Sequence, residues 1–149
     1  MNAVEQFDKG KGKIHKTEDK DLIETLNANT FPSVFMTRFL GPQLRARSAG
    51  DKKSAVINLT SYYTEWPAFN ASVFSAGKSF SDCVSQVVGY ENQNMDVLTV
   101  KSMPVQSARN PYGVKPEELV EGIFADLGHE RISYGPWQHS LFRHYILWQ

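Results

Sequence analysis

The chain has 149 residues, a formal net charge of zero and a hydrophobic content of 41%. This length fits one domain with a packed core, and the balanced charge gives no indication of a nucleic-acid partner. The single cysteine, Cys83, excludes an internal disulfide, and no apolar run approaches the roughly 18 residues of a membrane span.

The first half of the sequence predicts a loop, a long helix and a strand. Residues 1–18 are polar, rich in lysine and glycine, and are predicted to form a loop. Apolar residues at three- and four-residue spacing predict a helix over 19–47, which Pro32 should kink or split. After a polar turn, the apolar and β-branched run Ser54–Thr60 predicts a buried strand.

The second half continues the alternation of helices and strands. A second helix is predicted over 71–89, with one apolar stripe. This stripe consists of Val73, Ala76, Phe80, Cys83, Val84 and Val87. A strand follows at Asp96–Lys101. A third helix runs from Pro116 to about Leu127, and Gly128 suits its end.

A short strand at Arg131–Tyr134 and a helical segment from Pro136 complete the chain. The last segment carries an apolar stripe of Trp137, Leu141, Tyr145 and Trp148. We interpret this stripe as a core or partner face, with a lipid- or substrate-facing surface as the alternative. The four histidines lack the spacing of a metal site, so no metal is expected.

Strands that alternate with helices of this length predict an α/β fold with a parallel sheet and right-handed crossovers. We expect three strands, two long helices on one side and shorter helices that close the rest. An uncovered sheet edge is an aggregation hazard, so the edge at Ser54–Thr60 should be covered by a protein partner.

Four short motifs occur in a consistent order along the chain. Leu26–Asn29 reads LNAN, Ile57–Ser61 reads INLTS, Phe74–Lys78 reads FSAGK, and Lys101–Pro104 reads KSMP. They resemble the I-N-V-N, L-N-I-S-S, Y-S-A-T-K and Q-S-V-L-P motifs of the short-chain dehydrogenase/reductase family. The resemblance is closest to the very-long-chain 3-ketoacyl-CoA reductases and 17β-hydroxysteroid dehydrogenases. The phenylalanine also resembles the F-S-A-S-K of the inactive hydroxysteroid dehydrogenase-like proteins.

The resemblance implies the C-terminal half of a Rossmann-type, doubly wound parallel sheet. It places Asn29, Ser61, Phe74 and Lys78 at the four catalytic positions, and Lys78 and Pro104 at remnant cofactor contacts. In the family, tyrosine passes a proton to the carbonyl, lysine lowers the tyrosine pKa and holds the ribose, serine orients the carbonyl, and asparagine anchors a water.

Phe74 departs from that pattern because a phenyl ring has no proton to give. General acid catalysis contributes about 10²–10⁴-fold to a rate, so this loss is substantial. The neighbouring phenols are Tyr62 and Tyr63. Each site residue also has a structural interpretation. Ser61 would end a strand, Phe74 would pack in the core, Asn29 would bond within a kinked helix, and Lys78 would be a helix-surface lysine or a partner contact.

The sequence lacks the glycine-rich turn that holds the pyrophosphate, so we interpret 1–149 as one partial domain whose nucleotide-binding half would precede residue 1. No cofactor is expected for the isolated chain, and NAD(P) is expected only with a complementing N-terminal half. The leading hypothesis is a non-catalytic structural or interaction protein within a larger assembly. It would bind a partner at Ser54–Thr60, or dimerise through the helices at 19–47 and 71–89.

The alternative is an NAD(P)H-dependent 3-ketoacyl-CoA or 17-ketosteroid reductase whose nucleotide-binding half is supplied in trans. A third interpretation is an incomplete gene product that folds poorly alone. The sequence does not determine the compartment: the resemblance implies an intracellular protein, with association to the mitochondrion or to the endoplasmic reticulum as the two alternatives.

Overall fold

The computed structural model describes residues 12–48, 52–108 and 110–148, so residues 1–11 of the predicted N-terminal loop lie outside this part. The rest of that loop includes a 3₁₀ turn, η2, at Ile14–Lys16. The main elements, in chain order, are α1 (Asp19–Arg47), β1 (Ser54–Leu59), the 3₁₀ turn η3 (Tyr62–Thr64), α2 (Ser72–Glu91), β2 (Met95–Val100), α3 (Pro116–Asp126), β3 (Ile132–Ser133) and α4 (Trp137–Leu147).

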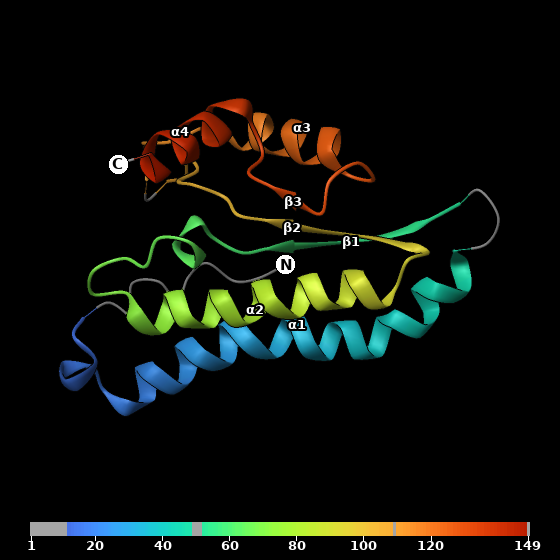
Figure 1. Cartoon of the computed structure of the whole chain (residues 1–149). Helices are drawn as coiled ribbons and strands as arrows, with labels where there is room; N and C mark the ends of the chain where they lie inside the picture. Colours follow the sequence, from blue (N-terminus) through green and yellow to red (C-terminus); the bar gives the residue numbers. More distant parts are fainter. Residues whose placement is uncertain (1–11, 49–51, 109, 149) are drawn as a thin grey trace.

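The three strands form one parallel sheet in the order β1-β2-β3. The register pairs Ser54 with Met95 and Leu59 with Val100, whereas β3 pairs through only two residues. The helices α1 and α2 cover one face, and α3 and α4 cover the other (Figure 1). The predicted three-stranded α/β architecture is therefore confirmed.

The long first helix is continuous through Pro32, so the predicted split is wrong. In the turns before the proline, polar side chains of α1 donate hydrogen bonds to backbone carbonyls of the preceding turn. For example, Asn29 Nδ2 donates to Thr25 O at 2.8 Å. The helix also packs lengthwise on α2, which holds both halves in one element. Its last turns bend toward the strands (Figure 1).

The contact between α1 and α2 is made by small and polar residues. Thr25, Asn29 and Ser33 are buried on α1 and face Gly77 and Ser81 of α2. The Ser81 hydroxyl donates to the carbonyl oxygen of Asn29 and lies 3.1 Å from the Ser33 hydroxyl. A Cβ at Gly77 would lie 2.9 Å from the Asn29 Cβ, so the two helices approach more closely than a larger residue allows.

This packing turns the apolar stripe of α2 away from the core. Ala76, Phe80, Cys83 and Val87 are exposed, and the other two members of the stripe are half-buried. The core is small instead: Leu98, Val100 and Ile123 are buried together, and Ile57, Leu59, Leu119 and Leu127 pack against them. In the described part of the chain, no helix combines the length and apolarity needed to cross a membrane.

The close approach of α1 to Gly77 of α2 predicts the effect of a substitution on stability. Gly77→Ala should lower the free energy of unfolding by roughly 1–3 kcal/mol, because Asn29 is held by α1 and cannot move freely away. Urea unfolding followed by circular dichroism measures this change. Gly41→Ala is the matched control: it meets no atom within 4 Å and should be neutral or stabilise by roughly 0.5–1 kcal/mol. Equal effects of the two substitutions would contradict the packing argument.

Candidate functional site

The fold brings Ser61, Phe74 and Lys78 to one place, because α2 returns from the end of β1 and runs back along the sheet. Ser61 follows β1 and caps η3, where its Oγ accepts the Tyr63 N–H at 3.3 Å. Phe74 is buried in the first turn of α2. The Nζ of Lys78 lies 5.6 Å from the centroid of the Phe74 ring and donates to the carbonyl oxygen of Leu59 at 3.3 Å.

Lys78 is a buried residue, so its prediction as a helix-surface lysine is wrong. Only 2% of its surface is exposed. The tertiary packing decides this, because Lys78 lies on the polar side of α2 that faces the sheet. Burial lowers the pKa of its ammonium from 10.5 to about 8.

Two tyrosines lie beside Phe74. The Tyr63 ring packs on the Phe74 ring in an edge-to-face contact, with centroids 6.2 Å apart, and the Tyr62 ring lies 4.2 Å from that of Tyr63. Burial, together with the hydrogen bond to Tyr63, raises the pKa of Tyr62. The phenol of Tyr62 is therefore a poorer proton donor than a free tyrosine.

The other predicted site residues do not join this cluster. Asn29 is fully buried between α1 and α2, where it packs on Gly77. Pro104 is exposed in the loop after β2, and its carbonyl oxygen accepts the Val114 N–H at 3.2 Å. The two residues assigned to the cofactor thus differ in exposure: Lys78 is buried on α2, whereas Pro104 is exposed in the loop after β2.

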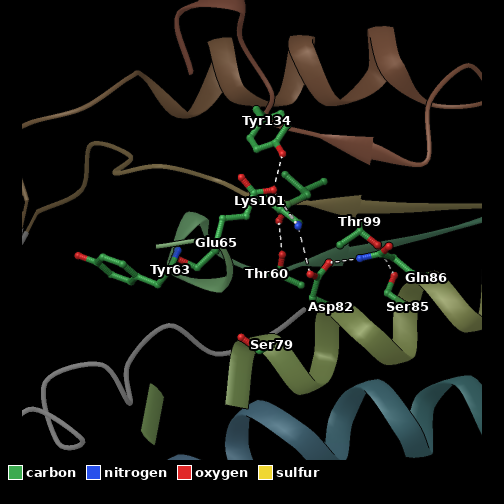
Figure 2. Close-up of polar contacts among 12 residues, drawn as sticks. Thr60, Tyr63, Glu65, Ser79, Asp82, Ser85, Gln86, Thr99, Lys101 and Tyr134 are labelled. Atoms are coloured by element: carbon green, nitrogen blue, oxygen red, sulfur yellow. Dashed lines mark hydrogen bonds and ion pairs between the residues drawn. The ribbon is translucent and has the colours of Figure 1, made fainter. Parts of the chain in front are cut away.

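A buried ionic network, which the sequence reasoning missed, lies at the carboxyl ends of β1 and β2. Lys101 is 5% exposed and its Nζ lies 3.0 Å from Glu65 Oε1 and 3.2 Å from Asp82 Oδ2. Figure 2 shows Lys101 between these carboxylates, with Gln86 Nε2 donating to Asp82 Oδ1 at 2.9 Å. One ammonium therefore joins the end of β2 to η3 and to α2.

Glu65 extends the network to the other layer of helices. Its carboxylate accepts the Tyr134 hydroxyl at 2.7 Å and Arg143 Nε at 2.9 Å, in addition to Lys101. Burial by itself would raise the pKa of Glu65, but the hydrogen bonds from these three donors outweigh it and lower the pKa from 4.5 to about 2. The pKa of Tyr134 is raised, first by burial and then by its bond to Glu65.

No spacing in the sequence could have indicated this network, because its members come from η3, α2, the end of β2, the loop after β3 and α4. The available signal was Lys101 at the end of an apolar strand, where a buried charge requires a partner. Within the described residues, no group of three or more His, Cys, Asp or Glu side chains could hold a metal ion.

Comparisons with known proteins show where this fold occurs. The structure of a 7β-hydroxysteroid dehydrogenase matches with a TM-score of 0.74 and 21% identity, over 90% of this chain and 55% of that one. A 3-ketoacyl-(acyl-carrier-protein) reductase from Brucella melitensis, complexed with NADH, matches with a TM-score of 0.72 and 16% identity, over 80% and 55%. A short-chain dehydrogenase from Sphingobium yanoikuyae, in complex with NADPH, matches with a TM-score of 0.72 and 17% identity, over 92% and 59%.

No protein-family model matches the chain, and no curated protein matches it. The structural matches confirm the predicted fold: the chain has part of the Rossmann-type fold of the short-chain dehydrogenases/reductases. It spans a little over half the length of these matched structures.

The Glu65 network predicts a pH-dependent contribution to stability. Because the folded-state pKa of Glu65 is lowered, its contribution is present above about 4.5 and is lost as the pH falls toward about 2. Glu65→Gln should therefore cost roughly 1–3 kcal/mol of unfolding free energy near neutral pH, and this difference should shrink across that window.

Urea unfolding at a series of pH values measures the effect. The exposed Glu121 of α3 supplies the control, Glu121→Gln, which should change stability little at any pH. A Glu65→Gln difference that stays constant from neutral pH to about 3 would contradict the assigned role.

Proposed function

We propose that this chain is a non-catalytic interaction protein, a subunit of a larger assembly that uses the fold of the short-chain dehydrogenases/reductases as a scaffold. The observation that carries the proposal is the outward apolar surface of the two long helices. We define the α1–α2 outer surface as the exposed apolar side chains of these helices, chiefly Leu26, Phe31, Phe35 and Phe39 of α1 with Phe80 and Val87 of α2.

Three phenylalanines of the α1–α2 outer surface contact one another along α1. The Phe31 and Phe35 rings meet edge to face with centroids 5.7 Å apart, and the Phe35 and Phe39 rings stack at 6.4 Å. Phe39 is 66% exposed. Contiguous exposed aromatic residues on a helix are typical of a protein interface, because burying them against a partner recovers their hydrophobic free energy.

The open edge of the sheet supports the same proposal. Within the described residues, β1 (Ser54–Leu59) pairs with a strand on one side only, namely β2. An unpaired strand edge presents backbone donors and acceptors that favour pairing with another strand. We therefore propose a second copy on the α1–α2 outer surface, with a partner strand at β1 as the other mode of assembly.

The residues at the candidate site favour the proposed interaction protein over a ketone reductase. Phe74 occupies the position of the proton donor, and Lys78 is buried beneath it with its ammonium bonded to Leu59. The feature that favours the alternative, a reductase completed in trans by a nucleotide-binding partner, is that Ser61, Phe74 and Lys78 still lie together. In that case Lys78 would have to become accessible in the complex.

The assembly proposal predicts that the purified chain is larger than a monomer. Multi-angle light scattering should give the mass of a dimer or a larger oligomer, or of a complex with a copurified protein. Phe35→Glu should weaken the association at least about tenfold, because it places a charge inside an apolar interface.

Phe124 of α3 supplies the matched control, since it is also exposed but lies on the opposite layer. Phe124→Glu should leave the mass unchanged. A stable, well-folded monomer with no bound partner would overturn the proposed function.

The catalytic alternative is tested by restoring the missing hydroxyl. Phe74→Tyr should give no NADPH-dependent ketone reduction, because one phenol does not make Lys78 accessible to a nucleotide. The assays are NADPH oxidation followed by absorbance and NADPH binding followed by isothermal titration. Turnover by this single variant would refute the non-catalytic assignment.

A further inference from the structure

A cavity of about 140 Å³ lies at the amino end of β2, between the end of α2 and the loop that leads from α3 into β3. Two glycines contribute to its lining, so no side chain fills the space beside them. The lining includes Gly89, Gln93, Val97, Gly128, Glu130 and Arg131. The cavity therefore combines backbone of the central strand with charged side chains of the loop before β3.

The short third strand leaves part of β2 without a neighbouring strand at this cavity. β3 pairs only with Thr99 and Val100 of β2. The Thr99 N–H donates to the carbonyl oxygen of Arg131 at 2.9 Å, so the backbone groups of Val97, two residues earlier, point to the same side of β2. Among the described residues, no backbone hydrogen bond joins Val97 to residues 128–131. Val97 is 7% exposed, and its buried N–H and C=O need a partner, which must be water or a ligand in the cavity.

Arg131 is held beside the cavity by an aromatic ring. Its guanidinium lies over the ring of Tyr90 on α2, with Cζ 4.6 Å from the ring centroid. A guanidinium that contacts an aromatic face keeps N–H donors available for a carboxylate. In the part of the chain that the structure describes, Arg131 makes no ion pair. The contact with Tyr90 therefore orients the guanidinium without using its hydrogen-bond donors.

The charges around the cavity determine which ligand fits. Asp96 also lines it, but this carboxylate lies 3.3 Å from Lys53 Nζ and is already paired. Glu130 is exposed and, like Arg131, has no ion-pair partner within the described ranges. One carboxylate and one guanidinium thus remain, beside the N–H donor and C=O acceptor of Val97. A matching ligand carries a negative and a positive group close together.

We propose that this cavity binds a small zwitterionic α-amino acid. The ligand carboxylate accepts hydrogen bonds from the Arg131 guanidinium and the Val97 N–H, and the ligand ammonium donates to the Val97 carbonyl oxygen and the Glu130 carboxylate. A cavity of about 150 Å³ holds a molecule of about six non-hydrogen atoms, which is the size of alanine. The cavity contains no residue of the α1–α2 outer surface, so the site is independent of the proposed assembly.

Titration of the isotope-labelled full chain with alanine, followed by two-dimensional NMR, tests the proposed site. The backbone amide signals of Val97, Gly128 and Arg131 should shift and reach saturation. Acetate and methylammonium each carry only one of the two charges, so both should bind at least about tenfold more weakly than alanine. The absence of saturable shifts with alanine, or binding of acetate as tight as that of alanine, would overturn the proposal.

Two substitutions in the cavity separate the roles of its charges. Arg131→Gln should weaken the binding of alanine at least about tenfold, because it removes the charged donor for the carboxylate. Glu130→Gln should reduce the preference of the site for alanine over acetate. The control is Lys115→Gln, since Lys115 is exposed at the opposite end of α3 and its loss should leave alanine binding unchanged.

Circular dichroism and the urea midpoint establish that each variant is folded. Binding of alanine by folded Arg131→Gln with the affinity of the wild type would contradict the assigned site. An equal loss of binding in Lys115→Gln would contradict it as well, because the effect would then reflect net charge rather than the cavity.

Discussion

Serine hydroxyls on α2 form hydrogen bonds both to α1 and to the sheet. The packing of the two long helices on the sheet depends on these bonds. Ser81 bonds to Asn29 and Ser33 of α1, while the Ser85 hydroxyl lies 2.8 Å from Asn58 Nδ2 of β1 and 2.7 Å from Thr99 Oγ1 of β2. Buried polar groups must be paired, so these bonds require the polar side of α2 to face inward. The apolar side chains of α1 and α2 then point outward, and the surface proposed for assembly results from that orientation.

The Glu65–Lys101–Asp82 network has the equivalent role at the carboxyl ends of the strands. Lys101 is almost completely buried, so it requires two carboxylates, and these come from η3 and from α2. Glu65 then has the capacity to accept bonds from Tyr134 and Arg143, which attaches α4 on the other face of the sheet. Both outer layers therefore present apolar surfaces for the same reason: the polar side chains are used to join the layers.

Secondary structure and site composition were predictable to different degrees. Local periodicity and turn residues gave the strands at Ser54 and Asp96 and the helix that begins at Pro116, with ends within one or two residues of those observed. The motif spacing also placed Phe74 and Lys78 one turn apart on the helix that follows the strand, and the Lys78 Nζ lies 5.6 Å from the centroid of the Phe74 ring. The burial of Lys78 was not predictable, because the sequence of one helix does not show which of its sides packs against the sheet.

The sequence by itself determined the order of strands and helices, the replacement of the tyrosine by Phe74, and the α/β class. These properties depend on short-range spacing and on residue identity. Only the tertiary structure decided which side of each helix faces inward, that Lys101 joins Glu65 to Asp82, and that the stripe from Trp137 to Tyr145 is exposed. Those outcomes depend on charge and hydrogen-bond pairing between segments up to 78 residues apart, which no local pattern records.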